Sequence, residues 1–111
     1  MRLFNFNIYP FDIKVDESKL VYFPLFGRIK TIPWKDLIRV EVQTTDQGPF
    51  LEDLFYVLVA KRQSVRISED EAAYCSLMTH FKNLKDFNFD AIVSASSCVE
   101  NRTYLCWQAE K

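Results

Sequence analysis

The chain of 111 residues is 49% hydrophobic and 15% aromatic, and its formal net charge is −1. This length and composition predict one domain over residues 1–111, built around a single hydrophobic core. The near-zero charge excludes a strong field that would attract nucleic acid or an anionic membrane, and two glycines are too few for a glycine-rich phosphate loop. No run approaches the roughly 20 apolar residues of a membrane span, and the N-terminal residues show no signal-peptide pattern. We therefore expect a cytoplasmic protein.

The first part of the chain is typical of a meander of short strands. Apolar residues alternate with charged ones over 11–15, which predicts a strand with one solvated face. A polar turn at 16–19 leads to a more apolar strand at 20–26, and Gly27 permits a tight reversal into a third strand at 28–32. We expect these three strands to pair in an antiparallel sheet.

The stretch 32–37 predicts a turn that redirects the chain. Pro33 has no backbone N–H to donate to a neighbouring strand. Trp34 follows it, and we expect this large side chain to be mostly buried as a plug at one end of the core.

Three further strands are predicted after this turn. Residues 38–45 alternate between apolar and polar side chains, as in a half-buried strand. Residues 54–60 form a nearly continuous apolar run, which indicates a strand buried on both faces. Residues 64–67 follow a short basic turn and complete a hairpin with that run.

Helical signals begin at Ser68. This residue and Glu71, three positions later, form a capping-box pattern that predicts a helix start. An apolar stripe at helical spacing then extends the predicted helix to about residue 84: Tyr74, Leu77, Met78, Phe81 and Leu84. Asn88 is positioned to cap a shorter helix with a shared apolar face of Phe89, Ile92 and Val93. Residues 102–108 predict a terminal strand.

Strands followed by helices predict an α+β fold. We expect an antiparallel meander sheet or a partly open barrel of six to seven strands, covered by two C-terminal helices. The expected core consists of apolar residues from the central strands and the first helix: Val40, Val42, Leu54, Tyr56, Leu58, Leu77 and Phe81.

The chain has few residues of the types that carry catalysis or bind transition metals. The chain has an odd number of cysteines, and they lack CxxC spacing: Cys75, Cys98 and Cys106. We therefore expect three reduced thiols that hold no metal. His80 is the one histidine, and nothing in the sequence places a nucleophile beside it. We expect a protein that is not an enzyme and has no cofactor.

The loop at 46–53 is the best candidate for a functional site. It gathers three carboxylates and one aromatic ring, with another acid on the adjoining strand: Asp46, Phe50, Glu52, Asp53 and Glu41. Three interpretations stay open, namely a solvated loop with a local turn at Asp46, an acidic-aromatic surface that binds a protein, and a divalent-metal site. The third is the weakest, because calcium loops need more oxygen ligands at closer spacing. For the function we adopt the second.

Several stretches resemble a family of small uncharacterised bacterial proteins. They are 32–37 (IPWKDL), 44–50 (TTDQGPF), 53–58 (DLFYVL) and the pair Cys106-Trp107. More weakly, the run of strands followed by a helix resembles the pleckstrin-homology-like (PH-like) barrel. The size and style resemble immunity proteins, which bind and neutralise a toxin domain. The resemblance to immunity proteins implies a non-catalytic cytoplasmic module that occludes a protein partner with a basic surface, such as a toxin.

The alternative is a PH-like domain that binds a peptide or a lipid headgroup. In PH-like lipid binders the first hairpin carries clustered basic residues, whereas here the turn at 16–19 holds two acids. A nucleic-acid partner is not expected, because most aromatic residues have core-facing spacing.

Overall fold

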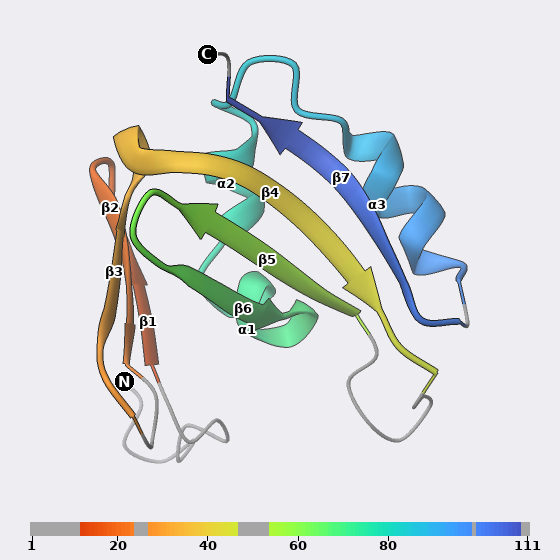
Figure 1. Cartoon of the computed structure of the whole chain (residues 1–111), viewed down its shortest axis with the longest axis horizontal. Coiled ribbons are helices and arrows are strands. Elements are labelled where there is room, and N and C mark those ends of the chain that lie inside the picture. Colours follow the sequence, from red (N-terminus) through yellow and green to blue (C-terminus); the bar gives the residue numbers. More distant parts are fainter. Residues whose placement is uncertain (1–11, 24–26, 47–53, 99, 110–111) are drawn as a thin grey trace.

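The computed structural model describes residues 12–23, 27–46, 54–98 and 100–109. Its N-terminal part is a three-stranded antiparallel sheet in the order β1-β2-β3, formed by β1 (Asp12–Val15), β2 (Lys19–Phe23) and β3 (Lys30–Pro33). The predicted meander is thereby confirmed. Figure 1 shows this sheet standing beside one end of a second, larger sheet.

The second sheet has four antiparallel strands in the order β6-β5-β4-β7. They are β4 (Leu37–Thr44), β5 (Leu54–Ala60), β6 (Ser64–Ser68) and β7 (Arg102–Gln108). The last strand returns across the molecule to pair with β4 rather than with β6. The fold is thus α+β with antiparallel sheets, as predicted, and the strands form two separate sheets rather than a closed barrel.

A single 3₁₀ turn, η1 (Trp34–Asp36), joins the two sheets. Pro33 precedes it with φ of −65°, the value that a proline ring imposes. Trp34 packs against the core and is mostly buried, as predicted, although it is not sealed from solvent. Its indole N–H donates to the backbone carbonyl of Asp16 at 2.8 Å, and a polar edge that needs such a partner tends to lie near the surface.

The predicted first helix is split into α1 (Glu69–Tyr74) and α2 (Leu77–Phe81). At its start the capping box is present, with Ser68 N donating to Glu71 Oε1 at 2.7 Å and Glu71 N donating to Ser68 Oγ at 3.2 Å. The expected continuous helix to residue 84 was wrong, because Ser76 adopts a left-handed conformation with φ of 58°. This break gives α2 its own direction, and both Leu77 and Phe81 are fully buried.

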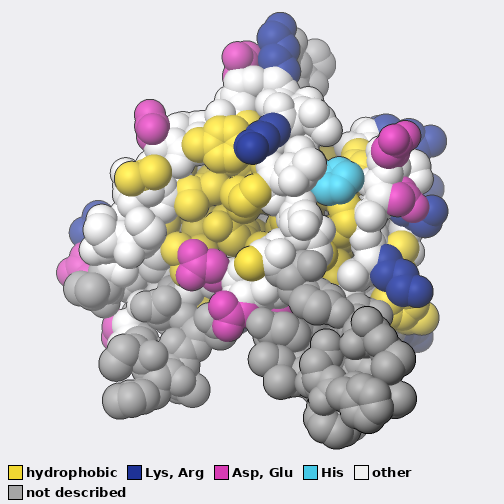
Figure 2. Space-filling view, turned by 180° about the vertical axis from the view of Figure 1, so that it is seen from behind, with side chains coloured by type: hydrophobic (Ala, Val, Ile, Leu, Met, Phe, Trp, Pro, Cys, Tyr) yellow, Lys and Arg dark blue, Asp and Glu magenta, His cyan; other side chains and the backbone are white. Residues whose placement is uncertain are grey.

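The last helix, α3 (Phe89–Ser96), packs against β7 and β4. Asn88 stands at its N-cap, as predicted, but its side chain makes no capping hydrogen bond. The residues buried on this helix are the small Ala91 and Ala95, which allow close approach to the sheet. Phe89 and Val93, the ends of the predicted apolar face, are 37% and 67% exposed. Ile92, the third residue of that face, is partly buried against the core, so the predicted face points inward only in part. Apolar side chains gather on this side of the molecule (Figure 2).

All seven predicted core residues are buried, and they belong to one cluster that includes apolar residues of both sheets. Phe81 lies at its centre, with its ring edge-on to Tyr56 at 5.9 Å and stacked on Phe87 at 4.7 Å between centroids. In the described part of the chain, the helices are too short to cross a membrane.

Candidate functional site

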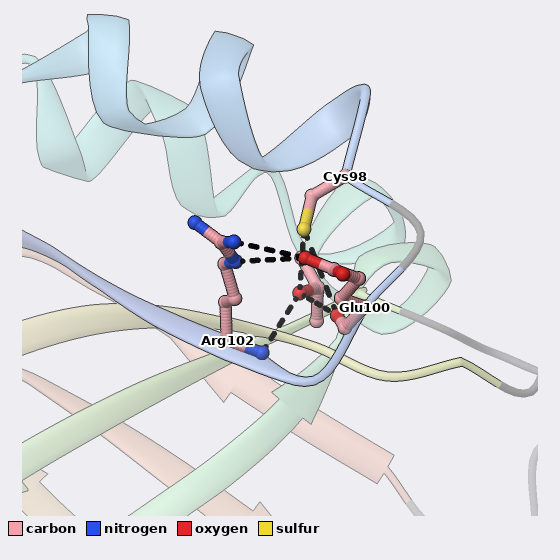
Figure 3. A network of polar contacts seen from close by, with 4 residues as sticks. Cys98, Glu100 and Arg102 are labelled. Carbon is pink, nitrogen blue, oxygen red and sulfur yellow. Dashed lines mark hydrogen bonds and ion pairs between the residues drawn. The ribbon is translucent and has the colours of Figure 1, made fainter.

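The far end of β4 and the start of β7 are held together by one threonine. Thr44 is 4% exposed, and its hydroxyl donates to the backbone carbonyl of Glu100 and accepts from Arg102 N at 3.2 Å. These bonds tie the turn before β7 to the end of β4 (Figure 3). Asp46 follows two residues later, so the acidic loop leaves the sheet from a fixed point.

An exposed ion pair lies on the same turn. Arg102 donates from Nη2 and Nε to the carboxylate of Glu100, at 2.9 and 3.1 Å. Both side chains are more than half exposed, and such a surface pair adds little to the stability of a fold. Its role is to order the turn rather than to supply reactive charge.

Cys98 lies beside this turn, with its Sγ 3.6 Å from the Thr44 hydroxyl (Figure 3). A hydrogen bond from the Tyr104 side chain is the largest of the interactions that lower the pKa of the Cys98 thiol. Burial instead raises the pKa of Cys75 and that of Cys106 to about 11. All three cysteines are free of disulfides. Nothing in the sequence distinguishes Cys98 from the other two, because Tyr104 contacts it only in the folded chain.

A polar cleft of about 400 Å³ opens at this end of the sheet. Its walls come from the ends of β4 and β7: Gln43, Thr44, Thr45, Asn101, Arg102 and Thr103. These groups offer hydrogen bonds rather than an apolar wall, whereas small-molecule sites are lined mostly by apolar side chains. The cleft suits polar contact with another chain better than enclosure of a small ligand.

Of the five predicted site residues, the structure describes two. Asp46 is exposed beside the cleft. Glu41 is half-buried on β4 and forms an ion pair with Arg39 at 2.8 Å, so its charge is largely neutralised. Phe50, Glu52 and Asp53 lie outside the described residues, and their grouping with Asp46 stays a prediction.

The side of the four-stranded sheet that faces away from α1 and α2 carries an apolar row. Along β5, buried residues alternate with half-buried ones, and the half-buried set points to this side: Phe55, Val57 and Val59. The prediction that residues 54–60 are buried on both faces was therefore wrong. Figure 1 views the sheet from this side, with α1 and α2 behind it. We call this side the outer face.

Strand register brings further groups onto the outer face. Val57 pairs with Glu41 on β4 and with Arg66 on β6, and Glu41 pairs in turn with Leu105 on β7. Leu105 is 49% exposed. The guanidinium carbon of Arg66 lies 3.7 Å from the centroid of the Phe55 ring, a cation–π contact. The outer face thus combines an apolar centre with arginine and aromatic groups.

A second cavity, of about 240 Å³, lies at the opposite end of β4. It is lined by Glu17, Trp34, His80, Asn83 and Leu84. The histidine that sequence reasoning left without a role is thus part of a cavity wall. Within the described residues, no group of three or more histidine, cysteine or acidic side chains is arranged to hold a metal ion.

Comparison with known proteins adds no relative. No family model matches the chain, and neither the curated proteins nor the solved structures gave a match. The fold and the site define a small α+β protein with two antiparallel sheets and an apolar row on the outer face of the larger one. The family resemblance stays a prediction.

Proposed function

We propose that this protein is a non-catalytic cytoplasmic protein-binding module. Its binding surface consists of the outer face together with the acidic loop that follows Thr45. The observation that supports this proposal is the half-buried row on β5 with the half-exposed Leu105 beside it. Apolar and aromatic groups beside arginine are the composition of protein-interface centres.

The partner is a protein with a basic surface, of the kind that an immunity protein occludes on a toxin. In this mechanism Asp46, Glu52 and Asp53 attract the basic surface and raise the association rate. The apolar groups of the outer face and Phe50 then lose their contact with water and slow dissociation. Binding covers the partner's own functional surface without any chemical step.

The polar groups next to the loop give the proposed surface a rigid support. Thr44, Glu100 and Arg102 bond to one another and fix the backbone of the turn. Rigid backbone beside an exposed acid provides a pre-organised contact, which lowers the entropy lost on association. The alternative PH-like function depends on a barrel mouth, and the two-sheet arrangement of the described strands offers no specific support for it.

The test compares two substitutions by lysine, one on the outer face and one on α3. Leu105 lies on the outer face and is 49% exposed, whereas Val93 lies on α3 and is 67% exposed. Once a partner has been captured from the native host by the wild-type chain, its affinity for each variant is measured by calorimetry. Leu105→Lys is expected to weaken binding at least tenfold, about 1.4 kcal/mol, and Val93→Lys to leave it nearly unchanged. Equal affinities of Leu105→Lys and wild type would remove the outer face from the proposal.

A further inference from the structure

The cavity at the start of β4 is built from three segments that are distant in sequence. Glu17 comes from the turn between β1 and β2, Trp34 from η1, and His80 from α2; Asn83 and Leu84 follow α2 directly. Figure 2 shows the histidine, in cyan, at the surface on the helical side of the molecule. The cavity is open to solvent and is separate from the outer face.

Hydrogen bonds hold the turn that carries Glu17. The Asp16 carboxylate accepts from Ser18 N at 2.7 Å, from Ser18 Oγ at 2.9 Å and from Lys19 N at 2.9 Å. The Lys19 ammonium lies 3.6 Å from the other oxygen of Asp16. The cation nearest in sequence to Glu17 is thus already paired, and in the described part of the chain Glu17 itself has no ion-pair partner.

The aromatic wall is fixed as firmly as the turn. Trp34 donates its backbone N–H to Ser18 O at 3.0 Å and its indole N–H to Asp16 O at 2.8 Å. Its ring is stacked on that of His80, with centroids 5.4 Å apart and planes inclined by 15°. Because the one polar hydrogen of the indole is used within the fold, the ring offers a ligand its π-electrons.

The chemistry of the lining selects a cation. Glu17 supplies a carboxylate, the Trp34 ring a negative π-face, and Asn83 an amide oxygen. None of the described lining residues is lysine or arginine. Leu84 adds an apolar edge, against which the methylene groups of a long side chain can pack.

The shape and size of the cavity restrict the kind of cation that fits. At about 240 Å³ the cavity is below the roughly 300–1,000 Å³ typical of drug-sized ligands and matches a single side-chain-sized group. The Trp34 and His80 rings stack on each other, so a ligand can contact this pair only from an outer face or an edge. Guanidinium is a flat cation that stacks on an aromatic face and forms two parallel hydrogen bonds with a carboxylate. An ammonium can be attracted to an aromatic face, but it is a compact charge with neither a flat surface to stack nor a fixed pair of parallel N–H donors.

We propose that this cavity binds a guanidinium group. The Glu17 carboxylate pairs with this group, and the Trp34 ring contacts it. The group comes either from an arginine side chain of a protein or from a small free guanidine. The site does not rest on the function proposed above. Asp46 lies beyond the other end of the eight-residue β4, roughly 25 Å away at about 3.3 Å per residue.

The test is an NMR titration of the full chain with N-acetyl-arginine methylamide. The matched control ligand is the citrulline analogue, which has the same shape without the charge. The two tryptophans give two indole N–H signals, and that of Trp107, which donates to Lys85 O at 3.0 Å, is an internal reference. We expect the arginine ligand to cause a saturable shift of the Trp34 signal alone. The citrulline analogue and the corresponding lysine analogue should bind with at least tenfold lower affinity.

Variants and a second ligand complete the design. Glu17→Gln is expected to weaken arginine binding at least tenfold, while Asp90→Asn, which changes an exposed acid on α3, leaves it unchanged; the melting temperature of each variant verifies folding. Propylguanidine, a free guanidine with the same single charge as blocked arginine, identifies the source: tighter binding of propylguanidine points to a small molecule, and tighter binding of blocked arginine points to a protein side chain. Equal binding of the citrulline analogue, no loss in Glu17→Gln, or no shift of the Trp34 signal up to the solubility limit of the ligand would each overturn the proposal.

Discussion

The indole ring of Trp34 is stacked on the imidazole ring of His80, and the two residues are 46 positions apart in the chain, between η1 and α2. The indole N–H also reaches back to the turn at Asp16. One side chain therefore links the junction of the two sheets, the first hairpin and the helical layer.

Removal of this link is expected to destabilise the whole fold. Trp34→Ala should lower the free energy of unfolding by about 2–4 kcal/mol, somewhat less than full truncation of a buried aromatic residue because Trp34 is not sealed from solvent. Trp34→Phe keeps a ring but loses the hydrogen bond to Asp16, and should cost about 1–2 kcal/mol. Urea denaturation of both variants measures the difference. Equal losses would mean that the stacked ring contributes little beyond the hydrogen bond.

The capping box at α1 should contribute measurably to stability. Ser68 is 7% exposed and Glu71 is 4% exposed, and each accepts from the other's backbone N–H. Ser68→Ala is expected to cost about 1 kcal/mol. The control is Ser97→Ala, which removes an exposed hydroxyl bonded to Ser94 O and should cost within about 0.5 kcal/mol. Thermal denaturation that ranked the two variants in the opposite order would contradict this account.

The turn at Asp16 should make stability sensitive to acid. Backbone and side-chain hydrogen bonds from Ser18 and the backbone N–H of Lys19 lower the pKa of Asp16 to about 2. Because the pKa is lower in the folded than in the unfolded chain, the stabilisation is present above about pH 4 and is lost as pH falls toward 2. The difference in melting temperature between wild type and Asp16→Asn should therefore shrink between pH 4 and pH 2. A direct ¹³C titration of the Asp16 carboxyl with a midpoint near 4 would contradict the assignment.

Cysteine reactivity should follow the pKa order in the structure. Cys98 is half-buried with a lowered pKa, whereas burial raises that of Cys75 and Cys106 to about 11. A thiol reagent near pH 8 should modify Cys98 first, because the thiolate is the reacting form. Tyr104→Phe should slow that reaction by removal of the hydrogen bond. In denaturant without reductant all three thiols should titrate, and a smaller number would contradict the expected reduced state.

The acidic loop should matter for binding and little for folding. Reversal of Asp46, Glu52 and Asp53 to lysine is expected to change stability by within about 0.5 kcal/mol for each residue, as is usual for surface substitutions. The same variant should bind a basic partner much more weakly, and the loss should be larger at low salt because screening is weaker there. Surface plasmon resonance over a range of salt concentrations measures this loss. A partner that binds the triple variant as tightly as wild type would show that the loop does not contribute to recognition.

Local patterns predicted the elements well. Strand β5 over residues 54–60 and strand β7 over residues 102–108 have the predicted bounds, and the helix start at Ser68 was predicted from two residues. The break between α1 and α2 was not predicted, because Ser76 adopts a left-handed conformation and no glycine stands there to indicate one. Phe89 and Val93 were predicted to face the core but are exposed. The cause is tertiary, since the alanines on the neighbouring side of α3 allow closer packing to the sheet.

The candidate site was predictable only in part. The clustering of Asp46 with its neighbouring acids stays a prediction from the chain, whereas the apolar outer face could not be predicted from it at all. An apolar run such as 54–60 has the same sequence pattern whether one or both faces of its strand are covered. The number of covered faces depends on how many layers pack against the sheet.

The sequence by itself determined the strands of the larger sheet, the turn chemistry at Pro33 and Ser68, and the core residues of the central strands and of α2. These depend on neighbours a few positions apart, through side-chain period and local hydrogen bonds. Only the tertiary structure decided that β7 pairs with β4, that Tyr104 reaches Cys98, and that Glu17 and Trp34 meet His80 around one cavity. These contacts join residues far apart along the chain. The free energy that stabilises them comes from burial of the assembled core rather than from any local pattern.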